Sequence, residues 1–338
     1  YGVEKYFRVT GDEEFLFECG LEMVFQTARF WASRVVLSEG NYEIRRVIGP
    51  DEFHEHVDNN AYTNYMVKWH LRLACMLFTY MTKRHRDRLE PICRKIELSE
   101  EEVAGWLSVS RCLKFSIDPA TMLVEQFDGY FRLRDYVIEG FDRKGHPKLP
   151  KGVTYRNIGS TTLIKQADVL LLMHLFPHAF SQEAKQANFD YYDKRTAHKS
   201  SLSHCTHAMM GLSVGKRSRA YHYFMKTALF DLENLHGNTA MGIHAAAVGG
   251  AWQTVVYGFG GLSIKSDRLV LKPWLPGKWK RLSFSVRWQD RHIDLSIYHD
   301  RISICITAPY DGEIPVSLYR KTHKIRTNRK EVLHYCSS

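Results

Sequence analysis

Carboxylates, histidines and asparagines gather on one short loop, "GPDEFHEHVDNNAYTN", residues 49–64. Asp51 and Glu52 are adjacent, and a carboxyl group can donate a proton to a leaving group or accept one as a general base. Gly49-Pro50 interrupts regular structure, whereas Asn59-Asn60 can cap the helix that we expect to follow. The residue types therefore fit two interpretations, acid–base catalysis or helix capping with surface charge.

Helices are expected to position this loop. Apolar residues recur at helical spacing from about residue 12 to residue 259, which predicts about eight helices in succession. The segments with this spacing are 13–35, 61–81, 100–113, 161–176, 181–195, 203–215, 218–235 and 240–259. The loop then joins two long helices.

The hydrophobic period changes to two from roughly residue 263. Apolar residues alternate in 282–286, 293–297 and 302–306, with "PGK" and "HDR" as turns, and this pattern predicts a small antiparallel β domain. We therefore divide the chain into helical residues 1–262, a β-sandwich domain at 263–318 and a basic tail at 319–338. A long irregular stretch, residues 114–160, is rich in aromatic residues and turn formers, and we expect it to wall a pocket.

Composition excludes several classes of protein. The 338 residues are 44% hydrophobic, enough for a large core, and no apolar run reaches the ~18 residues of a membrane-spanning helix. The seven cysteines are scattered without CxxC spacing, so the sequence predicts neither a metal site nor a disulfide framework. The scattered cysteines favour a reducing cytoplasm. We expect binding to neither membranes nor nucleic acid, because the Lys and Arg residues behind the net charge of +10 are spread along the chain except near the C-terminus.

The loop at 49–64 resembles the catalytic loop of glycoside hydrolase family 65, the disaccharide phosphorylases and related trehalases, in which the Glu of "GPDE" is the general acid. Four further segments resemble this family in the family's order. They are "VEQFDGYFRL" at 124–133, "TLIKQADVLLLM" at 162–173, "TAHKSSLSHCTHA" at 196–208 and "NTAMGIHAAAVGGAWQTVVYGFGGL" at 238–262.

The resemblance implies a fold and a setting. The family's architecture is a ring of paired helices, an (α/α)6 barrel, followed by a short β domain. We expect its first barrel helices, an early sugar-binding loop and an N-terminal β domain to precede Tyr1. The family also implies a homodimer.

Physical chemistry then assigns the roles. A glycosidic bond is cleaved when its leaving oxygen is protonated while a nucleophile attacks the anomeric carbon from the opposite face. Phosphate as nucleophile needs hydrogen-bond donors and positive charge, and "HKSSLSH" offers such donors before a predicted helix. The resemblance implies that Glu52 is the general acid, and it implies that Lys165 and Gln166, which match the family's Lys-Gln pair, contact the sugar. The predicted phosphate ligands are His198, Ser200, Ser201 and His244.

The predicted activity is inverting phosphorolysis of an α-glucoside, which yields β-glucose 1-phosphate and an acceptor sugar. No cofactor is expected, because inorganic phosphate is the co-substrate, and maltose, kojibiose, nigerose and trehalose all remain candidates. Two alternatives stay open. A trehalase-like hydrolase would need a carboxylate in place of the phosphate donors, and the chain could also be an inactive fragment or a basic binding module.

Overall fold

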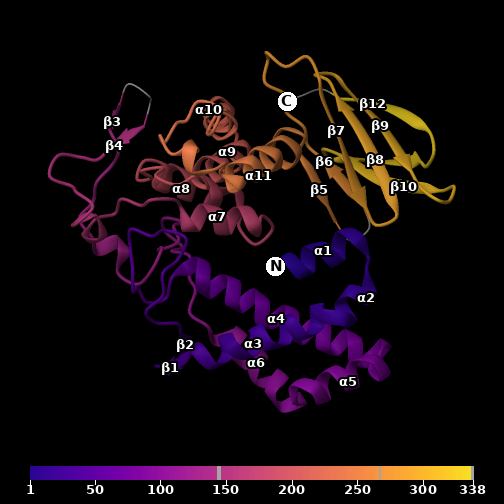
Figure 1. Ribbon diagram of the computed structural model, residues 1–338, viewed down its shortest axis with the longest axis horizontal. Helices are drawn as coiled ribbons and strands as arrows, with labels where there is room; N and C mark the ends of the chain where they lie inside the picture. The colour runs from indigo at the N-terminus through magenta and orange to yellow at the C-terminus, as the bar shows by residue number, and fades with distance from the viewer. Residues whose placement is uncertain (143–145, 266–267, 336–338) are drawn as a thin grey trace. The chain divides into compact units, whose positions relative to one another are not determined.

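The computed structural model describes residues 1–142, 146–265 and 268–335 (Figure 1). The chain divides into two compact units, which we treat separately. The first unit comprises Tyr1 and Glu13–Met210, and the second comprises Gly2–Asp12 and Gly211–Ser338.

Helices form most of the first unit. Its longer helices are α3 (Leu21–Arg34), α4 (Ala61–Arg84), α5 (Arg86–Ile96), α6 (Glu100–Cys112), α7 (Asp168–Leu175), α8 (Gln182–Asp193) and the start of α9 (Ser203–Ser213). Before α3 lie the short α2 (Glu13–Phe15) and a π-helical turn, η1 (Leu16–Gly20). Helix α4 packs against α3, α6 and α7, and α7 packs against α8.

Side-chain caps define where these helices begin. The Asn60 side chain accepts a hydrogen bond from the backbone N–H of Thr63 at 2.9 Å, which satisfies one of the unpaired donors in the first turn of α4. Helices α6 and α8 start in the same way at Ser99 and Ser181. The predicted capping role of Asn60 is therefore confirmed.

Two long connections carry the polar residues of the first unit. The first runs from α3 to α4 and contains a small hairpin, β1 (Val36–Ser38) with β2 (Asn41–Glu43). The second runs from α6 to α7 through η2 (Tyr130–Arg132), the pair β3 (Gly140–Phe141) and β4 (Pro147–Lys148), and η3 (Ile158–Ser160). Buried Val153, Ile158 and Leu163 form a local core within this second connection.

The second unit combines helices with two sheets. Its helical elements are α1 (Gly2–Thr10), α10 (Arg217–Ala228), η4 (Thr239–Met241), α11 (Ala245–Gln253) and η5 (Thr254–Phe259). The strands are β5 (Leu262–Ile264), β6 (Leu269–Leu271), β7 (Leu282–Trp288), β8 (Arg291–Ile297), β9 (Arg301–Thr307), β10 (Glu313–Leu318), β11 (Lys321–Arg326) and β12 (Lys330–His334).

These strands form two four-stranded sheets. One has the order β12-β9-β8-β7 and is antiparallel throughout, and the other has the order β11-β10-β6-β5 with β10 and β6 parallel. Ile302, Ile304 and Ile306 on β9 are all buried, as the period-two pattern predicts.

The sequence analysis missed or misread some elements. It did not predict α5, whose sequence "RDRLEPICRKI" contains Pro91 and buries only Leu89 and Ile96. A proline usually marks a helix boundary, so the sequence around Pro91 did not indicate a helix. The described part of the predicted basic tail contains β11 and β12 instead. These strands were not predicted because most of their residues are charged or polar, and few, such as Ile325, are buried.

The predicted fold class, mainly helical with a following β domain, is confirmed. None of the helices in the described ranges is long and apolar enough to cross a membrane.

Candidate active site

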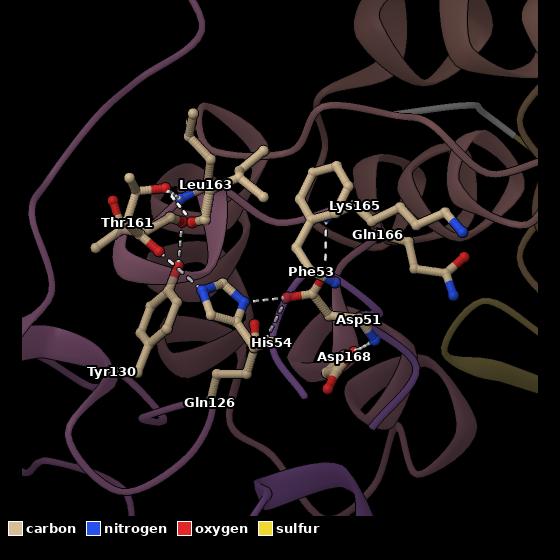
Figure 2. Close-up of polar contacts among 12 residues, drawn as sticks. Asp51, Phe53, His54, Gln126, Tyr130, Thr161, Leu163, Lys165, Gln166 and Asp168 are labelled. Carbon is tan, nitrogen blue, oxygen red and sulfur yellow. Dashed lines mark hydrogen bonds and ion pairs between the residues drawn. The ribbon is translucent and has the colours of Figure 1, made fainter. Parts of the chain in front are cut away.

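Asp51, a buried residue of the polar loop at 49–60, holds this loop in place through its hydrogen bonds. This side chain is 1% exposed. Its Oδ1 accepts hydrogen bonds from the backbone N–H of Phe53 at 3.2 Å and of Lys165 at 2.7 Å. One buried oxygen thus joins the loop that carries Glu52 to the segment that carries Lys165 and Gln166 (Figure 2).

The other oxygen of Asp51 is held by side chains. Oδ2 accepts from Gln126 Nε2 at 2.9 Å and lies 2.6 Å from His54 Nδ1. His54 Nε2 lies 2.8 Å from the Thr161 carbonyl oxygen, which can only accept, so Nε2 carries a hydrogen. The long connection between α6 and α7 therefore supports the loop at 49–60, because its residues Gln126 and Thr161 contact Asp51 and His54.

Asp168, the first residue of α7, holds the loop from a second side. Its carboxylate accepts from the Asp51 backbone N–H at 2.5 Å and from Asn60 Nδ2 at 2.7 Å. Burial, and next the charge of Asp51, raise the pKa of Asp168 well above its ordinary value. A Cβ atom on Gly49 would collide with the Asp168 carboxylate and the Asn60 amide, so the site requires glycine at this position.

Glu52 differs from its neighbour in facing outward. Its side chain is 59% exposed and forms an ion pair with Lys165, with 2.5 Å between Oε2 and Nζ. The Lys165 side chain is only 23% exposed. A carboxyl group on a rigid loop beside a partly buried cation can exchange a proton with a ligand at the surface.

Gln166 follows Lys165 in the chain and contacts Pro50 of the loop that carries Glu52. Its side chain is buried, and its Nε2 donates to the Pro50 carbonyl oxygen. Its Oε1 is also buried, and it has no hydrogen-bond partner among the described residues. Buried acceptors are usually paired, so Oε1 is suited to receive a hydroxyl group of a ligand.

Residues 197–202, which include Ser200 and Ser201 and are called the serine loop below, contact the segment that carries Lys165. The Lys199 backbone N–H donates to the Lys165 carbonyl oxygen at 3.3 Å, and the Ala197 N–H donates to Ile164 at 2.7 Å. Ser200 and Ser201 are half-buried and directly precede α9. Ser200 Oγ accepts from the Leu202 N–H at 3.2 Å, which is a local turn contact. The structure therefore brings Glu52, Lys165 and the serine loop together in the first unit.

His198 is placed differently from these serines. It is buried, its backbone is in the left-handed region at φ 49°, and its Nδ1 lies 2.8 Å from Ser203 Oγ. Its ring stacks on His204 with centroids 4.7 Å apart. The ring is therefore buried, whereas Ser200 and Ser201 are only half-buried.

His244 belongs to the second unit, where it immediately precedes α11. Its Nδ1 lies 2.6 Å from Asp231 Oδ1, and its backbone N–H donates to Asp231 Oδ2 at 2.8 Å. Hydrogen bonds from the backbone and then the ring of His244 lower the pKa of Asp231. The Asp231 carboxylate thus fixes the ring of His244.

A cavity of about 580 Å³ borders the acid loop. Its lining includes Gly49 and Pro50 and the aromatic side chains of Tyr1, Trp31, Tyr62 and Trp69. Ligand cavities are commonly of this size and rich in aromatic residues. The sequence analysis missed these aromatics because single aromatic residues on helices are usually core.

Comparison with known proteins agrees with the fold and the loop. The model of the glycosyl hydrolase family 65 central catalytic domain matches residues 1–253, and that of the family's C-terminal domain matches residues 262–325. The chain therefore has the helical architecture of the (α/α)6 class followed by a β domain. It belongs to glycosyl hydrolase family 65, as its resemblance predicted.

Individual relatives support this membership. The chain is 45% identical over 307 residues to kojibiose phosphorylase of Caldanaerobacter subterraneus, covering 90% of this chain and 40% of that protein. It is 34% identical over 327 residues to α,α-trehalose phosphorylase of Geobacillus stearothermophilus, covering 96% of this chain and 42% of that protein. The chain thus spans about 40% of the length of the curated relatives it matches.

A solved structure agrees over the same extent. It comes from the human microbiome, and its title assigns it provisionally to kojibiose phosphorylase. The TM-score is 0.87 at 29% identity, over 98% of this chain and 43% of that one.

Asp168→Asn should change how stability depends on pH. Because the folded-state pKa of Asp168 is raised, its contribution is fully present below the ordinary value of 3.8 and is lost as pH rises through the folded pKa. The stability of wild type relative to Asp168→Asn should therefore fall from pH 4 towards neutrality. Urea unfolding across this range measures it, and a constant difference would contradict the assignment.

Asp118→Asn is the matched control. The Ala120 backbone N–H and the Thr121 hydroxyl lower the pKa of Asp118, which lies at the surface. Its contribution is present above the ordinary value and lost as pH falls, so the wild-type advantage should change in the opposite direction.

Proposed function

We propose that the protein containing this chain is an inverting disaccharide phosphorylase. It cleaves an α-glucoside with inorganic phosphate and yields β-glucose 1-phosphate and a free acceptor sugar. The observation that supports this most is the junction of the Glu52–Lys165 ion pair with the serine loop, through the hydrogen bond from Lys199 to Lys165. An acid, a sugar-binding cation and neutral phosphate donors then share one side of the first unit.

Glu52 acts as the general acid in this proposal. Its proton passes to the glycosidic oxygen as the bond to the anomeric carbon breaks, and a phosphate oxygen forms the new bond from the opposite face. The ion pair with Lys165 is the arrangement in the ligand-free chain. Sugar hydroxyl groups that accept from Lys165 and donate to Gln166 would compete for these partners and leave Glu52 free to face the leaving oxygen.

Ser200 and Ser201 are the proposed phosphate donors. Both hydroxyl groups lie just before α9, and the N-terminus of a helix favours an anion. The segment "HKSSLSH" contains no carboxylate that could activate water, which favours phosphorolysis over hydrolysis. In this scheme buried His198 supports the serine loop, and the role of His244 as a phosphate ligand stays a prediction from the family resemblance.

The proposed substrate is kojibiose. The kojibiose phosphorylase of Caldanaerobacter is 45% identical to the chain, whereas a nigerose phosphorylase is 34% identical and a maltose phosphorylase 29% identical. The proposed partners of the site are thus a disaccharide and inorganic phosphate, without a further cofactor.

Glu52→Gln in the intact protein should lower kcat by ~10²–10⁴, because the amide has no proton to donate. Steady-state phosphorolysis of kojibiose measures the effect. Glu55→Gln is the matched control, since Glu55 lies on the same exposed loop and the charge change is identical. Near-full activity of Glu52→Gln, or equal loss in both variants, would exclude Glu52 as the acid.

Replacing both Ser200 and Ser201 by Ala should raise KM for phosphate. Each lost hydrogen bond to a charged ligand is worth ~1.5–3 kcal/mol, or about tenfold or more in affinity. KM for the disaccharide serves as the internal control and should change little, because Lys165 and Gln166 hold the sugar. Equal increases in both constants would assign the serines to general loop structure.

A further inference from the structure

Three buried side chains behind the serine loop form a cluster that the proposed reaction does not use. Asp193 ends α8, His198 lies in the turn that follows, and His207 lies in α9; they are 6%, 5% and 0% exposed. One potential ligand atom from each lies within 4.8 Å of the other two. His207 Nε2 is 4.0 Å from Asp193 Oδ1, too far for a hydrogen bond.

Ser203 orients both histidine rings. Its carbonyl oxygen lies 2.9 Å from His207 Nδ1 and can only accept, so Nδ1 carries the hydrogen and neutral His207 presents the Nε2 lone pair. Ser203 Oγ lies 2.8 Å from His198 Nδ1, which leaves His198 Nε2 as the other ring nitrogen. Histidines that bind metals usually have this second contact, with a carbonyl, hydroxyl or carboxylate at the opposite nitrogen.

The charges of the cluster also suit a cation. A buried carboxylate and a buried imidazole nitrogen with a lone pair are both groups that bind divalent cations. One divalent ion would interact favourably with both. Two imidazoles and a carboxylate are a donor set for Zn²⁺ or Co²⁺, with bonds of about 2.0–2.2 Å.

The distances require only small adjustments. In a tetrahedral site with such bonds, neighbouring ligand atoms lie about 3.3 Å apart. His207 Nε2 and Asp193 Oδ1, now 4.0 Å apart, would therefore have to approach by about 0.7 Å, and no pair of ligand atoms in the cluster is more than 4.8 Å apart.

We propose that Asp193, His198 and His207 form a binding site for one divalent transition-metal ion of the zinc class. This ion would fix the turn that carries Ser200 and Ser201, which the left-handed backbone of His198 begins. A non-glycine residue in this conformation needs strong contacts to hold it. Cysteine and histidine spacing predicted no metal site, because the three ligands include no Cys and the two histidines are nine residues apart, without the close spacing of a metal-binding motif. Metal binding itself does not depend on the proposed phosphorylase activity.

The test is metal binding by the intact protein. After chelator treatment and dialysis, calorimetric titration with ZnCl₂ should give one tight equivalent per chain, and CoCl₂ should give visible d–d absorption bands. His207→Gln and Asp193→Asn should each weaken this binding at least about tenfold, and Ser203→Ala by about 10–100-fold. Circular dichroism and thermal unfolding of each variant identify any that fails to fold, and Asp193→Asn keeps the shape of the side chain.

His204→Gln is the matched control. His204 is buried in the same helix and stacks on His198, but it is not among the three clustered groups. Its replacement should leave the tight equivalent in place. The proposal is overturned if wild type binds no stoichiometric zinc, or if folded His207→Gln and Asp193→Asn bind as wild type does. A normal kcat in a protein without zinc binding would reject the metal site and leave the phosphorylase proposal intact.

Discussion

The buried carboxylate of Asp51 is the interaction on which the candidate site depends. Its two oxygens accept hydrogen bonds from Lys165 and Gln126, which are far away in sequence, and from Phe53, two residues along the same loop. Burial of a charged group is tolerated only when such partners surround it. The partners therefore cannot move independently, and the loop that carries Glu52 takes one position relative to Lys165.

Two adjacent residues of this loop, Asp51 and Glu52, have different surroundings. Asp51 faces inward, and both of its carboxylate oxygens accept hydrogen bonds, whereas Glu52 faces outward and forms an ion pair with Lys165. The Glu52 carboxyl group is therefore accessible on a loop of fixed position, and a proton donor held in this way, as we propose for Glu52, needs little reorganisation during reaction. Asp168 and Asn60 add a second anchor and tie the loop to the starts of α7 and α4.

Local features of the site could be predicted from sequence. Asn60 caps α4 because its side chain needs only a neighbour three residues later, and the alternating isoleucines of β9 report burial directly. Non-local features could not. The role of Asp51 depends on Lys165, which is 114 residues away, and the inward turn of His198 depends on Ser203 and the helix that it begins. Family resemblance predicted roles for Glu52, Lys165 and the serines, but it did not show which neighbouring residues hold the loop in place.

The most direct test of the account is the dependence of turnover on phosphate, followed with the anomeric form of the product. In the intact protein, kojibiose should be cleaved only when inorganic phosphate is present, and proton NMR during the first turnovers should show β-glucose 1-phosphate. Steady release of free glucose at a comparable rate, with phosphate rigorously removed, would contradict the account and identify a hydrolase.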